Sequence, residues 1–283
     1  MKREYTIINK QIEELKSKGL KFKNEQQSKE IILRENYYFL INGYEEVFLN
    51  LKKESNSYEE ETYFEELYAI YSFDRELKNL IFDYINILEI NLKSYIVYEY
   101  IEKYGEDYLL KKENLDGSYQ SRLKLDTLEK KVKENIERNS KNDSDIQKYL
   151  NNMEAIPSLI LVKYFMFGNI TTFYEIMKKE DKAKVAEHFE DTPFVVEKYF
   201  RMLNVVRNIC AHGDILFDFT YGMSNLFSVM TVLKKLLDKE DFEDMFARIE
   251  DWLTYVKDEV DELSYHNLLN IMGFPKNYNN VMD

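Results

Sequence analysis

The chain has little of what interrupts or cross-links a fold. Its 283 residues include only 8 glycines, 3 prolines and one cysteine. Because glycine and proline punctuate regular elements, their scarcity favours long helices over a β-sandwich or barrel. A single cysteine excludes an internal disulfide framework and fits a reducing compartment, so we expect a cytoplasmic protein.

Long apolar runs and clustered metal ligands are also missing from the sequence. No apolar stretch approaches the roughly 18 residues that a membrane-spanning helix needs, so we expect no membrane partner. The three histidines, His188, His212 and His266, are scattered and lack the spacing of a zinc or other metal site. We therefore expect no metal and no cofactor.

What the chain does have is helical periodicity and apolar residues enough for a core, at 45% of the sequence. Residues 65–104 form the longest periodic stretch, with Leu77, Ile81, Tyr84, Leu88, Leu92 and Tyr95 as a core stripe. Residues 111–148 form a polar block that is either a solvent-facing helix around 123–136 or a mobile insertion. The other helices are expected at residues 7–18, 28–51 (interrupted near 42–43), 157–164 with an end at Gly168, 170–177, 182–189, 194–212, 225–237 and 242–256. Residues 214–221 are the one possible strand, and a short turn is expected to close the chain. The fold class is therefore all-α.

Charge is distributed unevenly along the chain, whose formal net charge is −13. Residues 1–34 hold nine Lys or Arg against five Glu, whereas residues 238–262 hold eleven Asp or Glu against three Lys or Arg. The acidic balance argues against tight, nonspecific binding to duplex nucleic acid. The basic N-terminal region can still meet a phosphate backbone.

The most informative stretch places Arg207, Asn208 and His212 within two turns of one expected helix that ends at Gly213. Imidazole can move a proton near neutral pH, and guanidinium can hold a phosphate with a planar fork of donors. These groups suffice to cleave RNA without a metal. The ordinary alternative is a histidine that favours the helix dipole ahead of a glycine cap.

Several segments around this motif resemble known proteins. Arg207 and His212 fit the R-x4-6-H pattern of the HEPN superfamily of ribonucleases, and the fuller string is similar to a signature of Abi-like abortive-infection proteins. Four other segments resemble that family in the same order along the chain. Together the five segments are residues 33–44, 67–77, 156–168, 206–212 and 272–278.

The resemblance implies a HEPN-type antiparallel helical bundle with additional N-terminal helices. Residues 1–60 would form the extension, and residues 61–283 the HEPN-like domain, with a polar insertion around 111–148. It also implies a homodimer, in which two motifs meet across a twofold axis. An RNA substrate is implied, and so is an antitoxin partner, which in some relatives is a small noncoding RNA.

Further residues are candidates for supporting roles. Glu89 and Lys93 match an E-x3-K pair found upstream of the motif in some HEPN toxins, although a pair at this spacing is often an ordinary helix ion pair. Tyr37, Tyr38 and Tyr44 lie in the more basic region and could stack on RNA bases, although aromatic residues at helical spacing more often belong to a core.

The function predicted is that of a metal-independent endoribonuclease toxin of phage defence or of a toxin–antitoxin system. Its reaction would be attack by the RNA 2′-OH on the adjacent phosphate, which excludes DNA as a substrate. One departure from many relatives is that Asp214 and Asp218 stand where basic and amide residues follow the histidine. Two alternatives stay open: a noncatalytic HEPN module that binds RNA or protein, and a helical scaffold that uses its acidic C-terminal third.

Overall fold

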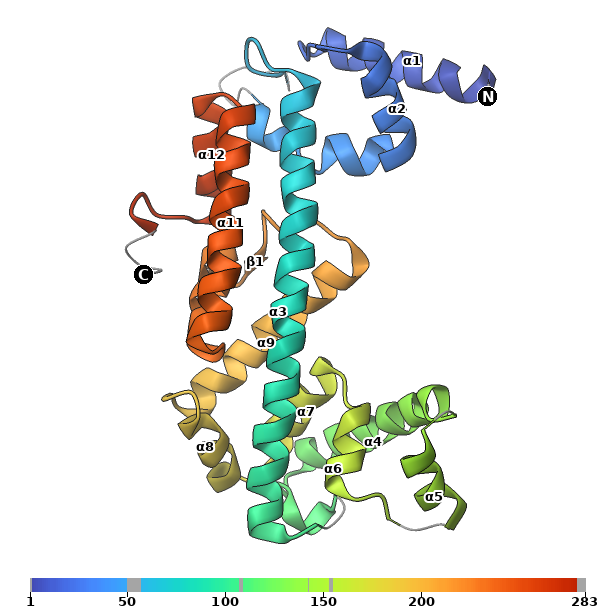
Figure 1. Cartoon of the computed structure of the whole chain (residues 1–283), viewed down its shortest axis with the longest axis vertical. Coiled ribbons are helices and arrows are strands. Elements are labelled where there is room, and N and C mark those ends of the chain that lie inside the picture. The colour runs from blue at the N-terminus through green and yellow to red at the C-terminus, as the bar shows by residue number, and fades with distance from the viewer. Residues whose placement is uncertain (1, 50–56, 107–108, 142, 153–154, 279–283) are drawn as a thin grey trace. The chain divides into compact units, whose positions relative to one another are not determined.

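The computed structural model describes residues 2–49, 57–106, 109–141, 143–152 and 155–278 (Figure 1). Over these residues the fold is all-α, as the sequence predicts. One short antiparallel hairpin pairs β1 (Thr220–Tyr221) with β2 (Ser224–Asn225). Parts of the predicted extension and of the polar block, at 50–56 and 142, lie outside the described residues.

Helices account for nearly all the regular structure. The α-helices are α1 (Lys2–Ser17), α2 (Glu25–Glu35), α3 (Phe64–Tyr104), α4 (Tyr119–Asn139), α5 (Ser144–Asn152), α6 (Ser158–Leu161), α7 (Phe167–Ile176), α8 (Lys179–Glu187), α9 (Pro193–His212), α10 (Leu226–Leu236), α11 (Lys239–Glu259) and α12 (Glu262–Met272). Tyr38–Asn42 form a π-helical turn, and Glu45–Phe48, Lys112–Asn114 and Val162–Tyr164 form 3₁₀ turns. The periodic apolar residues lie on α3. They are buried at Leu77, Ile81, Tyr84, Leu88 and Leu92, and Tyr95, at the end of the same series, is half-buried.

The chain divides into two compact units. The first unit comprises residues 1–81, 209–234 and 238–283, and the second comprises 82–208 and 235–237. The predicted division into an extension, 1–60, and a HEPN-like domain, 61–283, stays a prediction.

The first unit is built from helices whose ends are fixed by local hydrogen bonds. The α1 helix packs against α2, and α12 packs against α11 and the Glu45–Phe48 turn. Asn24 caps α2 by accepting a hydrogen bond from the Gln27 N–H, and Asp261 caps α12 through the N–H groups of Leu263 and Ser264. Where the sequence predicts a closing turn, the structure has the helix α12, because Asp261 supplies its N-cap.

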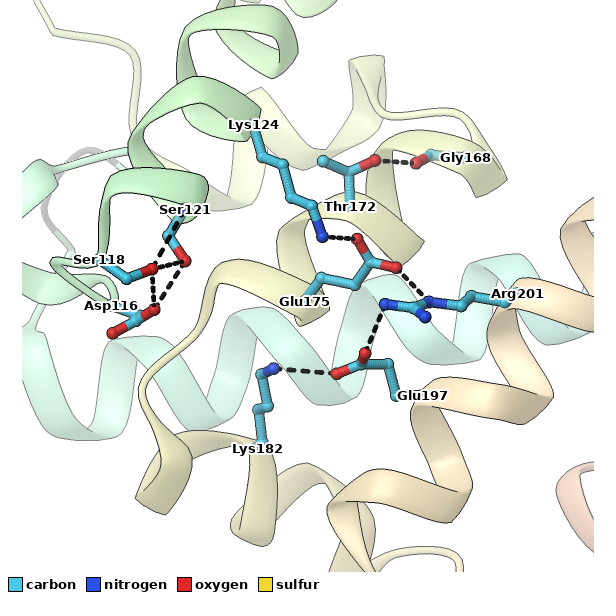
Figure 2. Close-up of polar contacts among 10 residues, drawn as sticks. All are labelled: Asp116, Ser118, Ser121, Lys124, Gly168, Thr172, Glu175, Lys182, Glu197 and Arg201. Carbon is cyan, nitrogen blue, oxygen red and sulfur yellow. Dashed lines mark hydrogen bonds and ion pairs between the residues drawn. The ribbon is translucent and has the colours of Figure 1, made fainter.

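In the second unit, hydrogen bonds between charged side chains connect neighbouring helices. Glu175 of α7 accepts hydrogen bonds from Lys124 of α4 and Arg201 of α9, and Glu197 of α9 accepts from Arg201 and from Lys182 of α8 (Figure 2). Burial acts to raise the pKa of Glu175, but its two cationic partners outweigh it and hold that pKa below the ordinary value. Glu175 therefore stays ionised at neutral pH and ties three helices together.

The polar block contains a helix with one buried face. Along α4, Leu125, Leu128, Val132 and Ile136 are buried, at helical spacing. Ser118 caps this helix by accepting from the Ser121 N–H, and its own hydroxyl donates to Asp116 (Figure 2). Of the two alternatives for this block, the helix is the one observed.

Two other sequence expectations were wrong. Gly168 does not end a helix but lies in the first turn of α7, because the Asn169 side chain accepts the Met166 N–H and starts a new helix there. Within 214–221 only Thr220 and Tyr221 form a strand. The N–H groups of Leu216 and Phe217 donate to the carboxylate of Asp74 rather than to a partner strand.

Candidate functional site

The motif lies in the last two turns of α9, and the helix ends as the sequence predicts. Gly213 has φ +76°, a left-handed conformation that glycine adopts without a Cβ penalty. The N–H groups of Gly213 and Asp214 both donate to the Ile209 carbonyl, at 3.0 and 3.1 Å. This cap fixes His212 as the last helical residue.

Arg207 is held in the second unit with part of its donor capacity unused. Its guanidinium carbon lies 5.4 Å from the ring centroid of Phe82. The Nε atom is buried and has no hydrogen-bond partner within the residues that the structure describes. Buried donors are nearly always paired, so this unsatisfied group marks Arg207 as a functional candidate. Its neighbour Asn208 is exposed.

His212 opens onto a cleft of about 740 Å³ that lies within the first unit. Three segments line it: residues 35–44 from the end of α2 through the π-turn, residues 71–79 of α3, and residues 210–215. His212 is exposed. Within the described parts of the chain its imidazole makes no side-chain hydrogen bond or ion pair, so both ring nitrogens can meet a ligand.

A glycine allows two walls of this cleft to meet. A Cβ at Gly43 would lie 2.7 Å from Cδ1 of Ile215 and 2.7 Å from the Phe39 carbonyl oxygen. A side chain at residue 43 would therefore force Ile215 and the turn before it to shift.

The three predicted RNA-binding tyrosines have different surroundings. Tyr38 lines the cleft and is 66% exposed, next to the exposed Phe39. Tyr44 also lines the cleft, but it is buried, stacked on Phe217 with ring centroids 5.4 Å apart. Tyr37 is half-buried, and burial raises its pKa to about 12. Tyr38 is therefore the tyrosine of the three that is free to stack on a base.

Asp74 is the residue whose role the sequence interpretation missed. Asp74 lies well inside α3 and is fully buried. Its carboxylate accepts from the Tyr44 hydroxyl at 2.7 Å and from the N–H groups of Leu216 and Phe217 at 3.1 and 2.8 Å. Lys78 pairs with it at 3.1 Å. Asp74 thus fastens the segment after His212 to α3 and to Tyr44, which follows the π-turn.

Comparison with protein-family models identifies the chain. The model described as Abi-like protein matches residues 30–218, which is more than half of the sequence. The chain belongs to the Abi-like protein family. No curated protein and no solved structure gave a significant match. The matched region of this Abi-like protein begins in α2 and includes His212, Asp74 and all the residues that line the cleft.

The two supporting candidates of the Abi-like chain form a local pair. Lys93 Nζ lies 2.7 Å from Glu89 Oε1 on one face of α3, and both side chains are more than four-fifths buried. They belong to the second unit, whereas the cleft that His212 lines lies in the first. A supporting role for this pair in catalysis stays a prediction.

Of the two aspartates that follow the histidine, Asp214 and Asp218, one lines the cleft. Asp214 is exposed and lines it, so it adds a negative charge beside His212. Asp218 is also exposed but is not among the lining residues.

Among the described residues there is no group of three or more His, Cys, Asp or Glu side chains arranged to hold a metal ion. In the same part of the chain, none of the helices combines the length and the apolar character needed to cross a membrane.

Proposed function

We propose that this Abi-like protein is a metal-independent endoribonuclease that acts as a toxin in phage defence or in a toxin–antitoxin system. The observation that carries the proposal is an exposed imidazole, His212, open on a cleft that also presents an exposed aromatic ring, Tyr38. Membership of the Abi-like family favours a role in abortive infection. A restraining antitoxin, such as a small noncoding RNA, is part of the same proposal.

The proposed reaction is an internal transesterification. The RNA 2′-oxygen attacks the adjacent phosphorus, a P–O2′ bond forms, the P–O5′ bond breaks, and a 2′,3′-cyclic phosphate results. The proton leaves the 2′-OH for a base, and a proton is delivered to the departing 5′-oxygen. His212 performs one of these transfers, an effect worth about 10²- to 10⁴-fold in rate. Arg207 stabilises the charge that develops on the phosphate oxygens, and Asn208 bonds the phosphate or orients the imidazole.

A noncatalytic RNA-binding module is the second candidate. The observation in its favour is Asp214, whose carboxylate lines the cleft and opposes the approach of a phosphate. The two candidates differ in one outcome, since the module binds RNA without breaking it.

Cleavage that persists without divalent metal is the result expected for the endoribonuclease. Purified protein should cut single-stranded RNA in excess EDTA, because the proposed proton transfers and charge stabilisation come from side chains alone. Product formation can be followed on denaturing gels. Loss of cleavage in EDTA, restored by Mg²⁺ with an RNA that has no folded structure, would contradict this mechanism. Binding without any cleavage would favour the module.

A composite site between two copies is expected from the spacing within α9. Residues five apart on a helix are rotated by about 140° from each other, so Arg207 and His212 do not share a face. In a dimer, Arg207 of one copy would serve the site that holds His212 of the other copy. A solution mass measurement should give twice 34.2 kDa for the protein, or show a dimer that forms when RNA is added.

Mixing two inactive variants tests the composite site directly. Arg207→Ala chains mixed with His212→Ala chains should recover part of the activity, because one of the two sites in a mixed dimer then holds both intact residues. A strictly monomeric protein whose cleavage rate per molecule is independent of concentration would exclude a site shared between copies.

A further inference from the structure

The cleft beside His212 has two cationic neighbours, and one of them is already neutralised. Within the described residues, Arg75 and Lys78 are the lysines and arginines that line it. Lys78 Nζ lies 3.1 Å from the buried Asp74 carboxylate and 3.4 Å from the Gly213 carbonyl oxygen, and its side chain is only 11% exposed. Its charge and donors are thus used inside the protein.

Arg75 is more exposed than Lys78 and is less fully paired. Its side chain is 45% exposed, and its nearest carboxylate oxygens, on Glu76 and Glu35, lie at 3.5 and 3.8 Å. Charge-assisted hydrogen bonds are about 2.7–2.9 Å long, so neither contact satisfies the guanidinium. Glu35 is engaged elsewhere, since it accepts from Arg34 at 2.9 Å and from the Tyr71 hydroxyl at 2.8 Å.

The aromatic rim of the cleft is held in place by a strained turn. Asn36 has φ +69°, a left-handed value that costs energy for a residue with a side chain. Its Oδ1 accepts the Tyr38 N–H at 3.0 Å. The turn places Tyr38 and Phe39 at the cleft with 66% and 63% of their surfaces exposed. Exposed ring surface on a hydrogen-bonded turn is suited to stacking on an unpaired base.

We propose that Arg75 binds a backbone phosphate of single-stranded RNA in the His212 cleft, and that a neighbouring base stacks on Tyr38. This rests on the proposed function, and it supplies the cleft with a phosphate-binding group on the same unit as His212. Arg207, by contrast, lies over Phe82 in the other unit. The planar fork of Arg75 suits a phosphate because it can donate two parallel hydrogen bonds.

The carboxylates of the cleft restrict the ligand to a single strand. Glu35 and Asp214 both line it, and the whole chain carries a formal net charge of −13. A duplex would bring two rows of phosphates and no exposed base face to this surface. A single strand can place one phosphate on Arg75 and turn a base toward the ring.

The test is binding of a probe that cannot be cleaved. A fluorescent 2′-O-methyl RNA of about 12 nucleotides lacks the attacking hydroxyl, and its dissociation constant can be measured by anisotropy between about 50 and 200 mM KCl. Arg75→Ala should weaken binding roughly tenfold and reduce the slope of log K against log salt by about 0.7, the value for one phosphate contact on a single strand. Arg75→Lys should keep the wild-type slope, because the charge remains.

Stacking of a base on Tyr38 is tested by separate substitutions. Tyr38→Ala should weaken binding about fivefold or more without changing the salt slope, and Tyr38→Phe should bind like the wild type. Arg248→Ala is the matched control, since Arg248 is 55% exposed in the same unit and has one distant carboxylate neighbour, Asp244, at 3.8 Å. It should change neither affinity nor slope.

The proposal is overturned if the wild type does not bind the probe, or if Arg75→Ala binds with wild-type affinity and slope. These failures can be told apart from failure of the proposed function. Cleavage of ordinary RNA that Arg75→Ala leaves unchanged would retain the ribonuclease and remove the Arg75 contact. Probe binding that depends on Arg75, in a protein that never cleaves RNA, would retain the contact and remove the ribonuclease.

Discussion

Replacing His212 with alanine is expected to lower the rate of RNA cleavage by about 10²- to 10⁴-fold, the range that one positioned proton-transfer group contributes. The loss would be chemical and not structural. His212 is exposed at the end of α9 and packs against no core, so its removal leaves the fold intact. Initial rates on a labelled single-stranded RNA, with circular dichroism of both proteins, measure the two effects separately.

His266→Ala is the matched control for this substitution. His266 is also exposed, in the same unit, and its Nδ1 contacts only the Glu262 carbonyl oxygen of its own helix, at 2.7 Å. It should cleave at the wild-type rate. Full activity of the His212→Ala protein would show that the reaction does not pass through this imidazole.

Replacing Asp74 with alanine is expected to cause the largest loss of stability, about 3–5 kcal/mol in the free energy of unfolding. The substitution would leave Lys78 without its counter-ion and the N–H groups of Leu216 and Phe217 without an acceptor, inside the protein. The Tyr44 hydroxyl would lose its partner as well. Urea unfolding followed by circular dichroism gives the difference.

Asp83→Ala separates this effect from a general effect of removing a carboxylate from α3. Asp83 lies on the same helix and is exposed, so its replacement should change the free energy of unfolding by less than about 0.5 kcal/mol. If Asp74→Ala were no more destabilising than Asp83→Ala, the buried carboxylate would not be what fastens the segment after His212.

The parts of the fold set by local periodicity could be predicted from the sequence. The buried residues of α3 recur every three or four positions, and Gly213 marks the end of α9. The sequence therefore predicted both the buried face of α3 and the end of α9. The position of His212 near the end of its helix followed from the same signal. Local patterns of this kind need no knowledge of the partner surface.

What the sequence could not supply were the long-range hydrogen bonds. Asp74 is separated from Leu216 and Phe217 by 142 and 143 residues, and nothing in its neighbours indicates that it is buried in mid-helix. The same contacts explain why 214–219 is not a strand. The gathering of Tyr38, Arg75 and His212 around one cleft likewise depends on packing between segments far apart in the chain.

The most direct test of the central claim is the chemistry of the RNA ends. The substrate is a labelled single strand, compared with a copy in which every 2′-OH is replaced by hydrogen, both incubated with the protein in EDTA. We expect that only the strand with 2′-hydroxyls is cut and that its 5′ fragment carries a 2′,3′-cyclic phosphate. Fragments that end in a 3′-hydroxyl, or equal cutting of the deoxy strand, would contradict this expectation.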